Sequence, residues 1–187
     1  MVADRHQKKQ TFLHWTWTMR FLHWKRNSGS KKIGDPAQKK SLVINDKNDD
    51  DIVISNEDTS YLIEQILYNI SENLGIAYRG GGTTKAGYDC SGLIYSTFKK
   101  YDIELPRSSR EMAQVGEKVD LKEAKKGDLI FFINRGQNRI NHVGLVVETN
   151  GEEVKFIHSA SRGGVMVSST KEPYYQKTFV QVNRVSL

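Results

Sequence analysis

The spacing of the apolar residues changes near Gly127, and this change limits the folds that the chain can adopt. Over residues 62–74, before the change, apolar side chains recur every three or four positions, which is typical of the buried face of a helix. After it, short runs rich in Val, Ile and Phe alternate with turn residues, which is typical of strands. Helices followed by strands predict an α+β domain in which N-terminal helices pack on a central antiparallel sheet. We expect about five strands, over residues 128–133, 141–148, 153–158, 164–168 and 179–185.

Three helices are predicted ahead of the sheet. The first begins at one of the capping residues 58–60 and ends by Gly75. The second runs over about 90–101, with its apolar positions on one face. The third is short and starts after Ser108, whose spacing to Glu111 forms a capping box. These helices supply the layer that covers the sheet.

The positive charge of the chain is confined to its N-terminal part. Residues 1–50 hold 11 of the 28 Lys and Arg residues but 5 of the 22 Asp and Glu residues, so the formal net charge of +6 resides there. The rest of the chain is neutral, and we therefore expect no nucleic-acid partner. We predict that residues 1–57 form a basic, flexible or disordered region and that residues 58–187 form the folded domain. An amphipathic helix on a membrane surface is the alternative for residues 1–24, which are rich in Trp and basic side chains.

No stretch of the sequence is apolar enough to cross a membrane. The most apolar N-terminal part, residues 12–24, is interrupted by His14, Arg20 and His23. It also lacks a small-residue cleavage site, and it therefore makes a poor signal peptide. We expect no integral membrane segment.

Cys90 is the only cysteine, so it forms no internal disulfide and is either a small buried side chain or a reactive thiol. It stands at the start of the second predicted helix, after the glycines at 80–82. A helix N-terminus lowers the pKa of a thiol, and its free N–H groups can bind an oxyanion. The glycine loop lacks the Lys-Ser/Thr pair of a phosphate-binding loop. The position therefore favours a reactive thiol.

Two histidines fall on a predicted hairpin. Residues 148–152 suit a three-residue loop with Gly151 in the left-handed conformation. That loop places His142 directly opposite His158 on one apolar face, and a change of one residue in loop length would separate their faces. Gly144, beside His142, leaves room for the second helix to approach. We assign His142 as the base for the thiol and His158 as the residue that orients it.

A metal site is the competing explanation for a cysteine and two histidines. Beyond the two histidines it needs a third ligand, and no nearby Cys, His or carboxylate has ligand spacing. We therefore expect no metal and no cofactor. Each residue alone is more often structural, but a thiol at a helix start combined with two cross-strand imidazoles favours catalysis.

Eight short motifs occur in the order found in one family of enzymes. By this order the chain resembles the NlpC-type cysteine peptidases, a papain-like family of bacterial cell-wall hydrolases, and is most similar to the Spr-type murein endopeptidases. The resemblance covers residues 60–187. The motifs are Tyr78-Arg79, Asp89-Cys90-Ser91-Gly92, Leu105-Pro106-Arg107-Ser108, Gly127-Asp128-Leu129, His142-Val143-Gly144, Phe156-Ile157-His158-Ser159, Gly164-Val165 and Glu172-Pro173-Tyr174.

The resemblance implies a papain-like fold, with a Cys/His/His triad made by Cys90, His142 and His158. It also implies roles for four further residues, Tyr78, Asp89, Ser91 and Arg107.

Tyr78 would lie beside the nucleophile and assist the oxyanion or the substrate. Asp89 and Ser91 would line the site and help to hold a stem peptide. Arg107 would either face the groove or form a structural salt bridge. The chain departs from the family at Gly80, where an aromatic residue is common. This departure leaves open which stem-peptide bond the protein prefers to cut.

These observations predict a peptidoglycan endopeptidase that cuts a stem-peptide amide bond through a thioester intermediate. The resemblance implies action in the cell envelope, in the periplasm or facing the wall, by a protein that we expect to be a monomer. Two other functions remain open at this point. One is a catalytically inert domain that binds peptidoglycan or serves as a scaffold, and the other is a related thiol amidase or acyltransferase with a different substrate.

Overall fold

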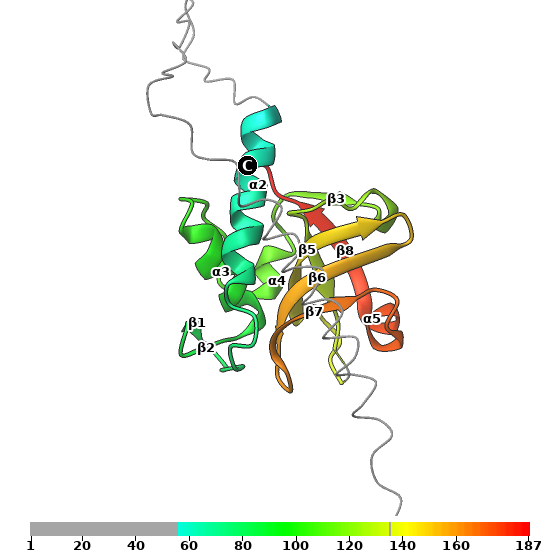
Figure 1. Cartoon of the computed structure of the whole chain (residues 1–187). Coiled ribbons are helices and arrows are strands. Elements are labelled where there is room, and N and C mark those ends of the chain that lie inside the picture. Colours follow the sequence, from blue (N-terminus) through cyan, green and yellow to red (C-terminus); the bar gives the residue numbers. More distant parts are fainter. Residues whose placement is uncertain (1–55, 135) are drawn as a thin grey trace, which may run out of the picture. The chain divides into compact units, whose positions relative to one another are not determined.

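The computed structural model describes residues 56–134 and 136–187, which lie in one compact unit. The predicted basic region at 1–57, with its alternative amphipathic helix, lies outside the described residues except for its last two positions. Figure 1 shows α2, α3 and α4 on one side of a sheet and α5 on the other. This is the predicted α+β architecture, in which most of the helices precede the main strands, although α5 comes late in the chain, just before the last strand.

Two of the helices begin after a residue whose side chain accepts a hydrogen bond from a free N–H group of the first turn. The main helices are α2 (Asn56–Ser71) and α3 (Cys90–Lys99), and α4 (Ser109–Met112) and α5 (Pro173–Thr178) are short. Asp89 caps α3 by accepting a hydrogen bond from the N–H of Gly92. Ser108 caps α4 by accepting one from the N–H of Glu111, at the two positions of the predicted capping box.

The main sheet has six strands in the order β3-β8-β4-β5-β6-β7, and every neighbouring pair is antiparallel. Five of them lie at the predicted positions. The sixth is a three-residue strand at the edge, beside β8, and its exposed Glu and Lys give no alternating apolar pattern. The strands are β3 (Glu117–Val119), β4 (Leu129–Phe132), β5 (His142–Asn150), β6 (Glu153–Ala160), β7 (Gly164–Ser169) and β8 (Phe179–Arg184). A small separate hairpin, β1 (Thr83–Thr84) and β2 (Gly87–Tyr88), precedes α3.

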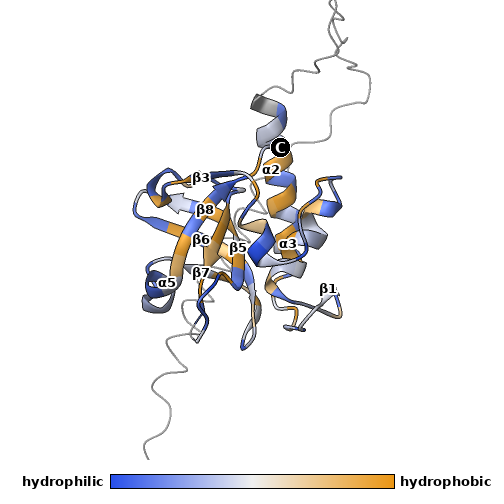
Figure 2. Cartoon of the chain, turned by 180° about the vertical axis from the view of Figure 1, so that it is seen from behind, coloured by the Kyte–Doolittle hydropathy of each residue, from blue (hydrophilic) through white to orange (hydrophobic). Residues whose placement is uncertain are grey.

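The centre of the sheet is buried on both faces. Toward α2 and α3, side chains such as Phe131, Leu145 and Ile157 form one apolar cluster. On the opposite face, Phe132 and Phe156 pack with Tyr175 of α5 in a second cluster. Figure 2 shows the apolar character of the central strands. Burial on both faces explains why all four residues of β4 are apolar, instead of every second one.

The β5–β6 hairpin differs from the predicted register. Its loop has two residues, because Asn150 pairs with Glu153, although Gly151 takes the predicted left-handed conformation with a φ of 58°. A loop of two residues would by itself place the two histidines on opposite faces. A β-bulge between Val146 and Glu148 inserts one extra residue in β5 and restores the common face.

The direct pairing of His142 with His158 is therefore wrong. Val146 pairs with Phe156 instead of Val154, and the same register brings Gly144 opposite His158. The histidines are diagonal neighbours on one face, a distance that long ring side chains can span. The space at Gly144 is taken by Phe156 and His158: a Cβ there would lie 2.7 Å from Cδ2 of Phe156. The prediction that this space serves the approach of the second helix is also wrong.

Candidate active site

Cys90 is the first residue of α3 and lies against the start of β5. Its Sγ atom is 3.9 Å from the carbonyl oxygen of Asn141, and the N–H of Val143 is directed at the same sulfur. The thiol thus contacts the backbone on both sides of His142. Its side chain is buried among the residues that α3 packs against the sheet.

A cluster of charged groups fixes the start of α3. The Asp89 carboxylate receives two hydrogen bonds from Arg107, at 3.0 and 2.8 Å, and one each from the N–H groups of Gly92, at 2.6 Å, and Gly81, at 2.8 Å. Arg107 also donates to the hydroxyl of Ser91 at 2.9 Å. Burial raises the pKa of Asp89, but these hydrogen bonds outweigh it and hold the pKa below its usual range. Of the two roles open for Arg107, the structure contains the salt bridge.

The two imidazoles are in direct contact. Nε2 of His142 lies 2.9 Å from Nδ1 of His158, and the rings meet nearly edge to face. His142 is 7% exposed and His158 is fully buried. Because Nε2 of His142 is occupied in this way, Nδ1 is the nitrogen left to receive a proton from a thiol.

Two hydroxyl groups complete the surroundings of His158. Its Nε2 lies 3.1 Å from Oγ of Ser168, on β7, and 3.2 Å from Oη of Tyr175, on α5. Neither residue was among the predicted site residues. Ser168 reaches the ring only through the pairing of β6 with β7, and Tyr175 only through the packing of α5 on the sheet. A single sequence carries no local signal for such contacts.

Burial disfavours the charged form of all three candidate catalytic groups. It lowers the pKa of His142 to about 4. Burial, and then the neighbouring His142, lowers the pKa of His158 well below its usual value. Burial also raises the pKa of the Cys90 thiol, although the N–H group of Val143 acts in the opposite direction. This direction differs from the lowered thiol pKa expected at a helix start, because the sulfur is enclosed between α3 and β5.

Tyr78 is the most accessible of the predicted site residues. The residue is 39% exposed. Its backbone forms an isolated bridge with Tyr88, just before Cys90. Burial raises the pKa of its phenol, and the negative charges of the Cys90 thiolate and Asp89 raise it further. The phenol therefore lies within electrostatic range of the sulfur, at the solvent side of the site.

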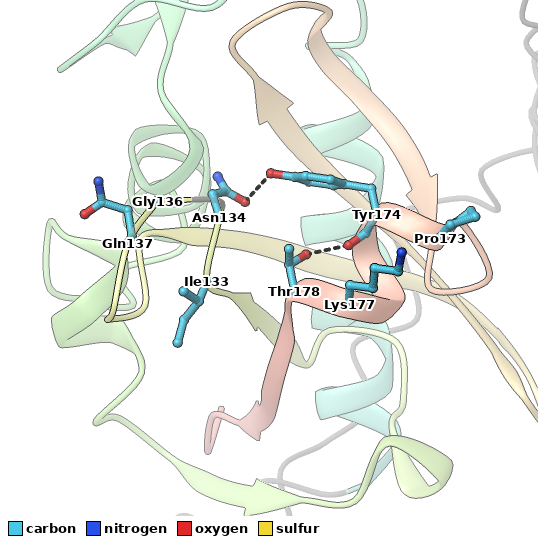
Figure 3. Close-up of a pocket in the computed structure, with 8 residues that line it drawn as sticks. All are labelled: Ile133, Asn134, Gly136, Gln137, Pro173, Tyr174, Lys177 and Thr178. Carbon is cyan, nitrogen blue, oxygen red and sulfur yellow. Dashed lines mark hydrogen bonds between the residues drawn. The ribbon is translucent and has the colours of Figure 1, made fainter.

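A shallow hollow lies next to the α5 side of the site. It has a volume of about 370 Å³ and lies between the β4–β5 loop and α5. Figure 3 shows Tyr174 in this hollow, donating a hydrogen bond to Asn134 at 3.0 Å. Tyr174 faces the hollow while the next residue, Tyr175, contacts His158.

The described residues contain neither a metal-binding cluster nor a membrane-spanning helix. Among residues 56–134 and 136–187, no group of three or more His, Cys, Asp and Glu side chains is placed to hold a metal ion. Within the same part of the chain, none of the helices has the length and apolar character needed to span a bilayer.

The sequence profile of the NlpC/P60 family matches residues 75–184. This range includes every candidate site residue described above. The chain belongs to the NlpC/P60 family. Its papain-like α+β fold is thereby confirmed, with six strands in the main sheet instead of about five.

The NlpC/P60 domain is similar to several named proteins. It is 38% identical over 135 residues to a probable endopeptidase NlpC homolog of Haemophilus influenzae, a match covering 71% of this chain and 69% of that protein. It is 38% identical over 112 residues to the murein DD-endopeptidase MepS/murein LD-carboxypeptidase of Escherichia coli, covering 59% of this chain and 56% of that protein.

A solved structure supports the same fold. A crystal structure of an NlpC/P60 family protein from Bacillus cereus superimposes with a TM-score of 0.60 and 28% identity, covering 65% of this chain and 39% of that one.

Proposed function

We propose that this protein is a cysteine peptidase that hydrolyses a stem-peptide amide bond in peptidoglycan. The observation that carries the proposal is the joint placement of Cys90 and His142. A thiol at the start of a helix contacts the backbone on both sides of a histidine, whose ring is held by a second histidine. Family membership and the similarity to proteins named as murein endopeptidases support this substrate class.

The reaction begins with transfer of the Cys90 proton to Nδ1 of His142. The sulfur attacks the carbonyl carbon of the substrate amide and forms a C–S bond, and the carbonyl oxygen becomes an oxyanion. The imidazolium then gives its proton to the nitrogen of the amide, the C–N bond breaks, and the amine leaves. His142 next takes a proton from water, whose oxygen attacks the thioester. The C–S bond breaks and releases the acid, and the Cys90 thiolate takes back a proton from the His142 imidazolium.

The surroundings of the sulfur suit this sequence. The backbone N–H groups of Val143, Ser91 and Cys90 act to lower the pKa of the Cys90 thiol and so favour the thiolate while it forms. Tyr78, which is partly exposed and within electrostatic range of the thiol, can donate to the oxyanion or contact the substrate. No step in this sequence requires a metal or a cofactor.

The proposal gives Asp89, Ser91 and Arg107 a mainly structural role, in place of the direct substrate contacts that the sequence suggested. Both Asp89 oxygens already accept protein hydrogen bonds, and Arg107 is engaged with Asp89 and Ser91. We assign them to holding the first turn of α3, and with it Cys90, in place. The exposed part of Arg107, whose side chain is 38% accessible, remains available to a substrate carboxylate.

The place of action follows from the substrate. Peptidoglycan stem peptides are the proposed partner, and the protein would therefore act in the cell envelope. The monomeric state and the flexible region over residues 1–57 remain predictions.

Digestion of purified muropeptides, read by mass spectrometry, tests the function. The intact chain should release stem-peptide fragments, and Cys90→Ala should release none. Ser96→Ala, a small change on the same helix outside the site, is the control and should cleave like the wild type.

Alkylation of Cys90 by iodoacetamide separates the alternative functions. A domain that only binds peptidoglycan would bind muropeptides and leave them uncut with an inert thiol, whereas a reactive thiol without muropeptide cleavage would identify a thiol enzyme with another substrate.

A further inference from the structure

Two hydroxyl groups that the proposed reaction does not use converge on the far nitrogen of His158. They come from separate elements, Ser168 from β7 and Tyr175 from α5. Both residues are buried, with exposed fractions of 3% and 8%. Nε2 of His158 thus lies within hydrogen-bond distance of two hydroxyl oxygens at once.

The contact between the imidazoles links their protonation. Nε2 of His142 and Nδ1 of His158 share one hydrogen bond, so only one of these nitrogens carries the hydrogen. If it is on His142, Nδ1 of that ring keeps a lone pair and can accept the thiol proton. If it is on His158, the neutral His142 must carry its hydrogen on Nδ1 and cannot act as the base. The tautomer of His158 therefore decides whether His142 is competent.

The two contacts favour the competent arrangement. Without a hydrogen, Nε2 of His158 has a single lone pair and can accept fully from only one hydroxyl, whereas an N–H on Nε2 can be shared between the two hydroxyl oxygens. An N–H there also needs an acceptor, because the ring is fully buried and an unpaired buried donor is costly. The hydroxyl oxygens of Ser168 and Tyr175 are that acceptor pair.

We propose that Ser168 and Tyr175 are positioning residues that hold His158, and through it His142, in the tautomers with hydrogen on Nε2. Their effect on catalysis rests on the proposed function, whereas their effect on the tautomers does not. Both residues are buried and contact the ring of His158, so they act through the imidazole pair. Oxygen acceptors that remain neutral suit this place, since a carboxylate would add a buried charge beside two neutral rings.

The tautomers can be read directly by long-range ¹H–¹⁵N correlation NMR on the full chain with labelled histidine at neutral pH. We expect both rings in the wild type to carry hydrogen on Nε2. The double variant Ser168→Ala/Tyr175→Phe should shift His142 toward hydrogen on Nδ1. It should also lower kcat by roughly 10²-fold with little change in KM, since a wrong tautomer removes the base and leaves substrate binding intact.

Matched variants separate this effect from a general loss of packing. Tyr174→Phe removes the hydroxyl of the neighbouring tyrosine, which is bonded to Asn134, and should change neither the tautomers nor kcat. Ser168→Thr keeps a hydroxyl and should retain the wild-type tautomers. If the double variant does not fold, each single variant is compared with Tyr174→Phe by the same two readouts.

The proposal is overturned if His142 of the wild type carries its hydrogen on Nδ1. It is equally overturned if folded Ser168→Ala/Tyr175→Phe keeps wild-type tautomers and wild-type kcat. Failure of the wild type to cleave muropeptides would instead reject the proposed function, and the NMR result would still decide the role of the two hydroxyl groups.

Discussion

The candidate catalytic groups rest in uncharged forms, since burial disfavours the thiolate and both imidazolium ions. In the proposed reaction, proton transfer from Cys90 to His142 must then create two charges in a buried site. The hydrogen bond from Nε2 of His142 to His158 stabilises one charge, and the N–H groups around the sulfur stabilise the other. The protein therefore holds a neutral pair that becomes charged during the reaction, instead of a preformed thiolate–imidazolium pair.

The depressed pKa values of the histidines predict that the protein loses stability in mild acid. Between pH 6.5 and about 4, His142 is protonated in the unfolded chain but not in the folded one, so the unfolded state binds more protons and the free energy of unfolding falls as the pH falls. His158 acts in the same direction. Between pH 7 and pH 5 His142 alone should cost about 2 kcal/mol, at about 1.4 kcal/mol per pH unit below 6.5. Urea unfolding at the two pH values measures the change.

The variant His142→Gln isolates this contribution. It lacks one of the two titrating rings, so its loss between pH 7 and pH 5 should be smaller than that of the wild type by about 2 kcal/mol. Equal losses in both proteins would mean that other groups cause the acid sensitivity.

At the scale of the elements, local sequence patterns predicted the positions of helices and strands. The register between strands depends on long-range pairing, which those patterns do not determine. The Ser108 cap, the helix start at Cys90 and five strands follow from spacing and turn residues. The register of the β5–β6 hairpin could not be predicted in this way, because residues 148–152 suit either a two-residue or a three-residue loop. Since the bulge compensates for the shorter loop, the predicted common face of the histidines holds although the predicted pairing does not.

The close approach of the glycine loop to α3 predicts a strong effect of Gly92→Ala. A Cβ at Gly92 would lie 2.0 Å from the carbonyl oxygen of Gly82 and 2.8 Å from Oδ1 of Asp89, so the helix start would have to move. We expect a loss of about 1–3 kcal/mol in the free energy of unfolding, because neither neighbour is a flexible chain end. Muropeptide cleavage should fall by roughly 10²-fold, since Cys90 moves with the helix start. Urea unfolding and initial rates test both effects.

Gly80→Ala is the matched control for this change. A Cβ at Gly80 meets nothing within 4 Å, although the residue belongs to the same loop. Its effect on stability should stay within about 0.5 kcal/mol, with an unchanged cleavage rate. Similar losses in both variants would indicate that the loop tolerates no side chain for a reason other than its contact with α3.

At the scale of the whole molecule, the site is assembled from both faces of the sheet. Cys90 belongs to the apolar cluster under α2 and α3, whereas the rings of His142 and His158 contact Phe132, Phe156 and Tyr175 in the cluster of the opposite face. The start of β5 is where the two sides meet, since His142 is its first residue and the sulfur contacts the residues next to it. Both layers must therefore pack correctly for the thiol and the imidazole to act together.

The separation of charge along the chain predicts different behaviour on soluble and on polymeric substrate. All candidate site residues lie between 78 and 175, and the excess of positive charge lies within residues 1–50. A chain of residues 56–187 should therefore cleave soluble muropeptides at the rate of the full chain, within about twofold. On intact peptidoglycan, a polymer with many carboxylates, the full chain should be faster at low salt and should lose that advantage near 0.5 M NaCl, because salt screens attraction between separated charges over roughly 10 Å at 0.1 M and less above it. Dye release from labelled sacculi across a salt series measures this. A constant ratio of the two rates at all salt concentrations would show that the basic segment does not act through its charge.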